Sequence, residues 1–123
     1  MLKSKIRAKS SSVALTPTPA LFDILQALDS LLDRSDLTLP SYVVLTSGSE
    51  GHPGDGIHAP TSRHYTGEAL DIRTKNFVSL EAAKGFYKAL QTALGPAFYV
   101  AFEFVGTPNA HIHVQPSRGT MYV

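Results

Sequence analysis

The chain has 123 residues and no cysteine, and its 11 basic and 10 acidic side chains give a formal net charge of +1 at pH 7. This length fits one domain with an apolar core of its own, and the lack of cysteine excludes disulfides, thiolate metal ligands and a cysteine nucleophile. No stretch approaches the ~18 apolar residues of a membrane-spanning helix, and the N-terminal segment is too polar for a secretory signal.

The charge is unevenly distributed along the chain. Residues 1–12 contain four basic residues and no acid, which leaves 7 basic and 10 acidic residues, a net −3, in the rest. A body of this sign argues against a dedicated nucleic-acid-binding domain. We therefore expect a basic, flexible leader over residues 1–18, able to touch a polyanion, and a single domain over residues 19–123.

The first half of this domain predicts a helix, a strand and a long loop. Thr18 is a good N-cap, Pro19 suits the first helical position, and leucine and isoleucine continue at helical spacing to about residue 34. Residues 42–46 are rich in β-branched side chains and predict a strand. Residues 47–63 contain four glycines and two prolines, which predicts a loop, and loops of this length are often functional.

The second half predicts a strand, a helix and two further strands. Residues 67–74 alternate between polar and apolar side chains, and residues 79–95 carry a helical apolar stripe behind a serine N-cap. Residues 98–105 form a strongly apolar strand, and residues 111–115 form a short one with two histidines on one face. This order predicts an α+β domain in which a small, mainly antiparallel sheet is packed by two main helices.

Histidine and aspartate residues form a pattern that indicates a metal site. His64 lies seven residues before Asp71, and His111 and His113 form a His-x-His pair. Imidazole nitrogens and a carboxylate bind borderline divalent ions, and a set of three leaves a position open for water. We expect His64, Asp71 and His113 to converge on one ion, although Asp71 could instead pair with a neighbouring arginine.

Residues 62–71, Ser-Arg-His-Tyr-Thr-Gly-Glu-Ala-Leu-Asp, resemble a known signature. It is the Ser-x-His-x-x-Gly-x-Ala-x-Asp motif of the D-alanyl-D-alanine carboxypeptidase family, which groups with lysostaphin-type and hedgehog-type zinc domains. The downstream residues 111–113 resemble the second motif of that family, so the resemblance covers about residues 40–116. It implies a hedgehog/DD-peptidase-like fold, and the small size resembles that of phage-encoded cell-wall peptidases.

The resemblance implies an activity and a metal. His64, Asp71 and His113 would bind Zn²⁺, and the ion would lower the pKa of a bound water to about 7. The implied reaction is hydrolysis of D-amino-acid-containing bonds in peptidoglycan stem peptides. With no signal peptide, we expect synthesis in the cytoplasm and action at the bacterial cell wall.

Substrate binding is implied for the residues around the first motif. Ser62 would hydrogen-bond the substrate. Relatives often carry an arginine after the Ser-Gly of the first strand, where it binds a substrate carbonyl or carboxylate, and residues 47–52 contain none. Arg63 or Arg73 would substitute for it, although Arg73 could equally orient the metal-binding aspartate.

The general base has two candidates. Many relatives place a glutamate three residues before the zinc-binding histidine, a position held here by Ala110. His111 fits the His-x-His version of the motif, and Glu103 could approach from the preceding strand because adjacent strands lie only about 5 Å apart. We favour His111. These departures keep open a non-catalytic zinc-binding domain and, from the ligand types alone, an Fe(II) oxygenase.

Overall fold

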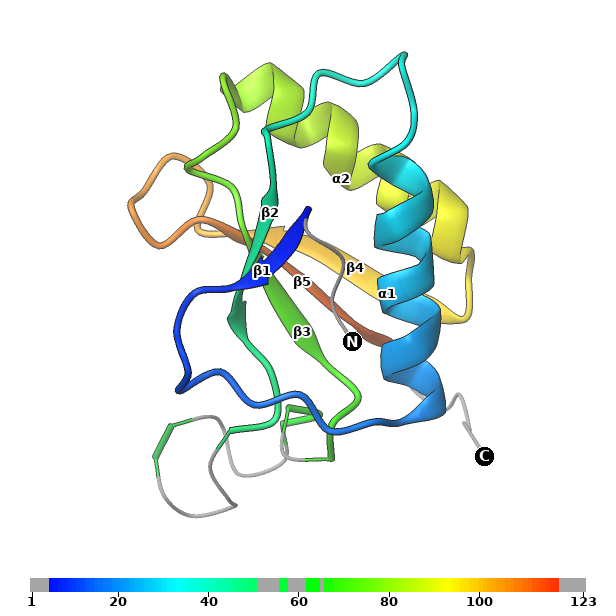
Figure 1. The fold of residues 1–123 in the computed structure, drawn as a ribbon, viewed down its shortest axis with the longest axis vertical. Coiled ribbons are helices and arrows are strands. Elements are labelled where there is room, and N and C mark those ends of the chain that lie inside the picture. Colours follow the sequence, from blue (N-terminus) through cyan, green and yellow to red (C-terminus); the bar gives the residue numbers. More distant parts are fainter. Residues whose placement is uncertain (1–4, 51–55, 58–61, 65, 118–123) are drawn as a thin grey trace.

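The computed structural model describes residues 5–50, 56–57, 62–64 and 66–117. They form a five-stranded, mostly antiparallel sheet and two helices (Figure 1). This confirms the α+β class expected from the sequence. The elements are β1 (Ile6–Ala8), α1 (Pro19–Leu31), β2 (Val43–Ser47), β3 (Leu70–Arg73), α2 (Leu80–Leu94), β4 (Phe98–Glu103) and β5 (His111–Pro116).

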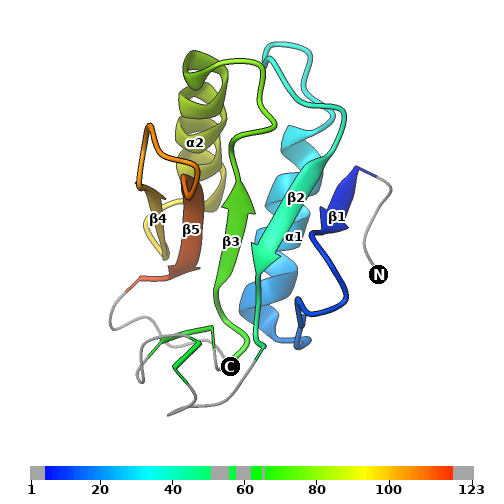
Figure 2. The same ribbon diagram turned by 90° about the vertical axis from the view of Figure 1, so that its left-hand side faces the viewer.

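The strands follow the order β1-β2-β3-β5-β4 across the sheet. β1 and β2 are parallel, and the other neighbours are antiparallel. A parallel pair needs a crossover connection, and α1 lies in the chain between these two strands. Both helices cover the same face of the sheet, which leaves the other face open (Figure 2). Neither helix is long and apolar enough to cross a membrane within the described residues.

Local signals in the sequence define the ends of both helices. The Thr18 hydroxyl oxygen accepts a hydrogen bond from the Leu21 amide at 3.1 Å, so it caps α1. The Ser79 hydroxyl oxygen accepts from the Ala82 amide at the same distance, 3.1 Å, and caps α2. Gly95 ends α2 with a φ of 72°, a left-handed conformation that favours glycine.

The apolar core lies between the helices and the covered face of the sheet. Side chains alternate along β3 and β5, so every second residue enters this core. Burying each large apolar side chain stabilises the fold by about 1.5–3 kcal/mol. The fully buried members include Ile24, Leu28, Leu45, Leu70, Ile72, Phe86, Leu90, Ile112 and Val114.

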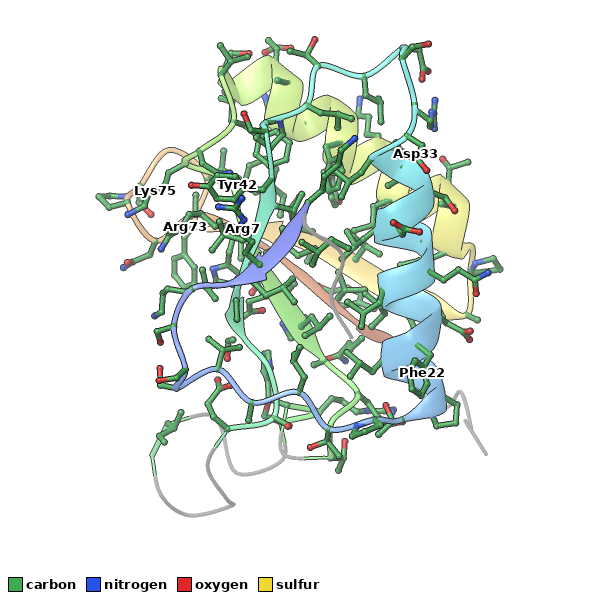
Figure 3. The ribbon with its side chains drawn as sticks, viewed as in Figure 1. Arg7, Phe22, Asp33, Tyr42, Arg73 and Lys75 are labelled. Atoms are coloured by element: carbon green, nitrogen blue, oxygen red, sulfur yellow. The ribbon has the colours of Figure 1, made fainter. Side chains whose placement is uncertain are left out.

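β1 lies within the segment expected to be a flexible leader. Ile6 is 3% exposed and belongs to the core, while the Arg7 guanidinium lies 4.1 Å from the centre of the Tyr42 ring (Figure 3). The Lys9 amide extends the pairing by donating to the Leu45 carbonyl at 2.8 Å. The leader interpretation is therefore corrected for this strand. The missed signal is the alternation of apolar and basic residues in this short segment.

Two strands are shorter than expected, for identifiable backbone reasons. β3 begins at Leu70 rather than residue 67, because the Gly67 amide donates to the His64 carbonyl at 3.0 Å and closes a turn there. β4 ends at Glu103 because Phe104 has a φ of 54°, which is incompatible with an extended strand. Both differences shape the open face of the sheet beside the histidines.

Candidate metal centre

The register of the sheet brings the predicted site residues together on its open face. β3 and β5 pair Asp71 with His113 and Arg73 with His111, and β4 sets Glu103 opposite His111. Along β3 and β5 these side chains alternate with residues of the apolar core. The site is therefore built on three adjacent strands whose other face is held by the helices.

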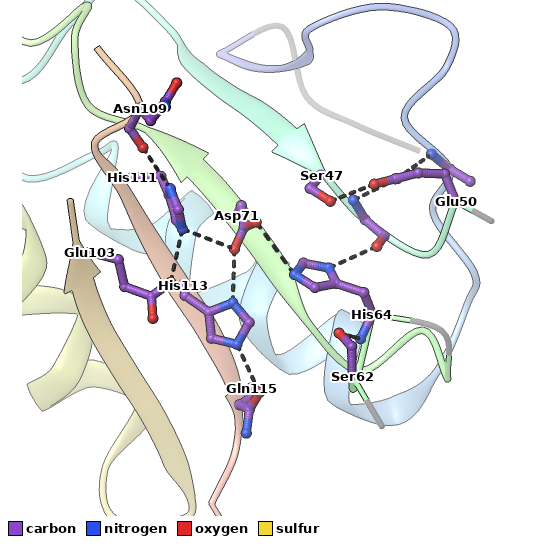
Figure 4. A network of polar contacts seen from close by, with 12 residues as sticks. Ser47, Glu50, Ser62, His64, Asp71, Glu103, Asn109, His111, His113 and Gln115 are labelled. Atoms are coloured by element: carbon purple, nitrogen blue, oxygen red, sulfur yellow. Dashed lines mark hydrogen bonds and ion pairs between the residues drawn. The ribbon is translucent and has the colours of Figure 1, made fainter. Parts of the chain in front are cut away.

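His64, Asp71 and His113 converge as the sequence predicts (Figure 4). His64 Nε2 lies 3.4 Å from Asp71 Oδ2, and His113 Nδ1 lies 2.8 Å from Asp71 Oδ1. One possible ligand atom from each residue falls within 4.8 Å of the others. His64 is 4% exposed, so its ring is fixed by packing. The group could hold a metal ion.

The other ring nitrogen of His64 and of His113 faces an oxygen. His64 Nδ1 lies 2.8 Å from the Gly48 carbonyl, and His113 Nε2 lies 2.7 Å from Gln115 Oε1. A carbonyl oxygen only accepts, so these nitrogens carry the ring protons and the other nitrogens turn their lone pairs toward Asp71. With the rings in this tautomer, a cation between the two nitrogens and the carboxylate, either a proton or a metal ion, would stabilise the group. Metal-binding histidines in proteins are held by this same type of outer hydrogen bond.

The protonation of Asp71 and His113 reflects this contact. Burial acts to raise the pKa of Asp71, but its contacts with the His113 and His64 rings outweigh burial and hold that pKa well below its usual range. Burial acts to lower the pKa of His113, but hydrogen bonds to Asp71 and Gln115 outweigh it and raise that pKa. Without a metal ion, the two shifts together favour an ionised Asp71 beside a protonated His113.

The two candidate bases form one hydrogen-bonded pair. His111 Nε2 lies 2.9 Å from Glu103 Oε1 and 3.8 Å from Asp71 Oδ1. The His111 Nδ1–H donates to the Asn109 carbonyl at 2.8 Å, which fixes this ring too. His111 Nε2 and Glu103 can therefore share a proton beside the His64–Asp71–His113 group.

Ser62 and Arg63 lie in the turn that carries His64. The Ser62 hydroxyl oxygen accepts a hydrogen bond from the His64 amide at 3.1 Å, so it supports the backbone of that turn. Arg63 Nη1 lies 3.3 Å from Glu68 Oε1 in an ion pair within the same turn. These contacts are structural ones. His52 and His58, the other two histidines of the chain, lie outside the described residues.

Two glycines let the loops of the site pack closely against the segment before α1. A Cβ atom at Gly48 would lie 2.0 Å from the Ala14 carbonyl oxygen, so no residue with a side chain fits at this position. Gly67 has a φ of +77°, and its Cβ would lie 2.8 Å from Thr16 Cβ. The Thr18 hydroxyl donates to the Gly67 carbonyl at 2.9 Å. Residues expected in the leader thus hold both loops that position His64.

Glu50 fixes the Gly48 carbonyl that faces the His64 ring. Its carboxylate accepts hydrogen bonds from the Gly48 amide at 2.8 Å, the Ala14 amide at 3.2 Å and the Ser47 hydroxyl. Burial acts to raise the pKa of Glu50, but these hydrogen bonds outweigh it and lower that pKa. This support has no sequence signature because it acts through backbone atoms. Gln115 is a further residue not expected from the sequence, although strand alternation sets it on the face of His113.

Comparison of the sequence with models of known protein families matches none of them, and comparison with curated proteins finds no match. Among the described residues, the His64–Asp71–His113 group is the arrangement that most clearly indicates a function.

Proposed function

We propose that the chain is a zinc-dependent peptidase that hydrolyses D-amino-acid-containing bonds of bacterial peptidoglycan stem peptides. The observation that carries this proposal is the convergence of His64 Nε2, His113 Nδ1 and the Asp71 carboxylate, with both rings oriented by oxygen acceptors. The Ser-x-His-x-x-Gly-x-Ala-x-Asp and His-x-His motifs, in the order of the D-alanyl-D-alanine carboxypeptidase family, support the substrate class and a hedgehog/DD-peptidase-like fold.

The donor set fits Zn²⁺. Two imidazole nitrogens and one carboxylate, with no thiolate in the chain, are ligands of catalytic zinc sites. His64 Nδ1 faces the Gly48 carbonyl and His113 Nε2 faces Gln115 Oε1, so the other nitrogen of each ring, which faces Asp71, is the one that would bind a cation. When bound, the metal ion supplies a Lewis acid and a water of lowered pKa.

His111 and Glu103 would serve as the groups that accept a proton from an attacking water and deliver one to the leaving amine. Their contact of 2.9 Å would let the proton be shared between them. His111 Nε2 is also 3.8 Å from Asp71 Oδ1, so the proton-accepting atom borders the metal group. We assign the pair, rather than one residue of it, as general base and acid. The Ser62 hydroxyl keeps its own proton available for a substrate oxygen.

A non-catalytic zinc-binding domain is the second candidate. The observation that favours it is the pairing of Arg63 with Glu68, which occupies an arginine that would otherwise substitute for the missing substrate-binding one. Such a domain would bind zinc through the same residues and would hydrolyse no peptide. Metal analysis also tests an iron-dependent alternative, because two histidines and a carboxylate suit Fe(II) as well.

A hydrolysis assay on the zinc-loaded protein tests the proposal. Incubation with a panel of stem peptides, followed by mass spectrometry, should release product that disappears with a chelator and returns with added zinc. The His64→Ala variant should bind no zinc and release nothing, while Asp23→Ala, on exposed α1 surface, should match the wild type. Bound zinc without turnover on any peptide would favour the binding domain instead.

A further inference from the structure

Two chain connections at one end of the sheet carry an exposed apolar surface (Figure 2). They are residues 74–79, between β3 and α2, and residues 104–110, between β4 and β5. Exposed apolar side chains that gather in one place mark an interaction surface. Of the seven large apolar side chains exposed in the described part of the chain, four lie in or directly beside these connections and are called the apolar tip: Val78, Leu80, Phe104 and Val105.

Hydrogen bonds hold the two connections together. The Thr74 hydroxyl donates to the Ala110 carbonyl at 3.2 Å and joins one connection to the other. The Phe77 amide donates to the Thr74 carbonyl at 3.0 Å, and the Thr107 amide donates to the Phe104 carbonyl at 3.1 Å. The apolar tip is therefore carried on two turns whose backbone is fixed, and its exposure belongs to the fold.

Lysine side chains lie beside the apolar tip. Lys75 precedes Val78 in the first connection and lies at the margin of the molecule in Figure 3. Lys84 follows Leu80 by one helical turn and therefore lies on the same face of α2. Neither ammonium group forms a hydrogen bond or an ion pair with another described residue. Both charges are thus available to a partner of opposite charge.

Few negative charges oppose these lysines. Residues 73–84 contain three basic side chains and one acidic side chain, that of Glu81, and residues 104–110 contain no charged one. The Glu103 carboxylate, just before the second connection, lies 2.9 Å from His111 Nε2. This end of the molecule therefore combines protruding apolar side chains with an excess of positive charge.

We propose that the apolar tip docks onto an anionic lipid membrane surface. Apolar side chains sink into the boundary between headgroups and acyl chains, while lysine stems reach back to the lipid phosphates. Anionic lipids attract such cations without a fixed pattern of acidic partners, and lipids rearrange around two protruding turns. A hollow of about 220 Å³ between the connections can receive an apolar chain, since it is lined by Phe77, Leu80, Ala83 and Phe102.

Docking in this way leaves the candidate metal centre accessible. The apolar tip follows β3, whereas His64 belongs to the turn that precedes this strand. The Phe104 ring centre lies 5.8 Å from that of His111, so the tip meets the site only at its margin. The open face of the sheet would remain in water next to the membrane. This surface adds a binding function to the proposed peptidase activity and does not depend on it.

Co-sedimentation of the full chain with lipid vesicles tests the inference. Vesicles of phosphatidylglycerol and phosphatidylcholine in equal parts should bind the protein, and vesicles of phosphatidylcholine alone should bind it at least about tenfold more weakly. Added salt should weaken the binding, because it screens surface charge. Lys75→Gln should reduce the affinity about fivefold, whereas Lys88→Gln, about 12 Å beyond Leu80 along α2, should have a smaller effect.

Apolar variants separate insertion into the membrane from attraction by charge alone. Phe104→Asn removes the ring and keeps a residue that tolerates the φ of 54° at this position. It should weaken binding to the anionic vesicles about tenfold, and Val78→Ser should weaken it several-fold. Phe22→Asn is the matched control, because Phe22 is 58% exposed on α1 and Phe104 is 64% exposed. This control should bind as the wild type does.

Equal binding to both kinds of vesicle, or wild-type binding by Phe104→Asn and Val78→Ser, would overturn the inference. Light scattering without lipid provides a second decision. A dimer that these two variants convert to a monomer would assign the apolar tip to a second copy of the chain and would also overturn it. None of these measurements uses zinc or turnover, so their outcome is distinct from that of the peptidase proposal.

Discussion

The two faces of β3 and β5 carry different kinds of side chain, although both faces are formed by the same two short strands. On the helix-covered face, Leu70, Ile72 and Ile112 are fully buried in the apolar core. On the open face, His113 Nδ1 on β5 lies 2.8 Å from Asp71 Oδ1 on β3. Strand alternation alone separates the two sets, because successive side chains point to opposite faces.

Along both strands, residues that stabilise the core alternate with residues of the candidate site. The covered face fixes the strands in register, and the register in turn sets the distances among the polar groups. The open face contributes little apolar burial and concentrates the charged groups. Substitutions on one face should therefore change folding, and those on the other should change metal binding.

The largest effect is expected for Asp71→Asn on the open face. This change removes the anionic ligand, so zinc affinity should fall by more than the about 10–100-fold typical of outer-shell changes, and hydrolysis should fall below detection. The circular dichroism spectrum should stay that of the folded protein. Zinc titration with a competing chelator measures the affinity, and Asp23→Asn is the matched control. Normal zinc affinity in Asp71→Asn would refute the ligand assignment.

On the covered face, Ile112→Ala should act in the opposite manner. Loss of this fully buried side chain should reduce the free energy of unfolding by about 2–5 kcal/mol, while the folded fraction keeps its zinc stoichiometry. Urea denaturation followed by circular dichroism measures the loss, with the highly exposed Val78→Ala as control. A variant of unchanged stability that loses zinc would contradict the separation of the two faces.

A smaller effect is expected for Gln115, which orients a ligand without binding the metal. Gln115→Ala should weaken zinc binding about 10–100-fold, because His113 Nε2 loses its acceptor. Gln115→Glu keeps an oxygen acceptor and should restore most of the affinity. Gln26→Ala, on the exposed side of α1, controls for unrelated effects. Equal affinities for the Ala and Glu variants would show that the contact does not orient the ring.

The smallest effect should be the pH dependence. As pH rises, the stability of the metal-free protein should fall, whereas its affinity for zinc should rise. The pKa of His113 is raised in the folded protein, so its contribution to stability is present below the unfolded value of about 6.5 and is lost as pH rises through the raised value. The metal-free protein should therefore lose a few degrees in Tm between about pH 6 and pH 8. Zinc must displace this proton, so its affinity should rise over the same range.

The lowered pKa of Asp71 predicts a second loss of stability, at acid pH. Its contribution to stability is present above the unfolded value of about 3.9 and is lost as pH falls toward the lowered one, so the metal-free protein should also lose stability in acid. Differential scanning calorimetry across the pH range measures both slopes. The His113→Gln variant should abolish the loss at high pH, and a wild-type protein whose metal-free Tm rises from pH 6 to pH 8 would contradict the assignment.

The sequence predicts the helices and the approach of His64 to Asp71 well because their signals are local. Ser79 and Gly95 bound α2 at the expected positions, and the His64 and Asp71 pattern lies in ten residues of chain. The pairing of His111 with Glu103 depends on the register of β4 and β5, which spacing alone leaves open. The support of His64 by the Gly48 carbonyl uses a backbone atom and has no side-chain signature.

The edge strand β1 shows a different limit of sequence-based prediction. Its three residues contain one buried isoleucine, which is too little apolar surface to indicate a strand in isolation. Pairing with β2 supplies the missing stabilisation through backbone hydrogen bonds, including the one from the Val43 amide to the Lys5 carbonyl at 2.7 Å. A charged, alternating segment can therefore belong to the sheet and still resemble a terminal leader.

Zinc stoichiometry is the most direct test of the proposed metal centre. The full chain, loaded with zinc at neutral pH and passed over a desalting column, should retain one zinc per molecule by native mass spectrometry. Its His64→Ala and Asp71→Asn variants should retain none. A wild-type protein that retains no zinc, or variants that retain as much as the wild type, would contradict the assignment of His64, Asp71 and His113 as a metal site.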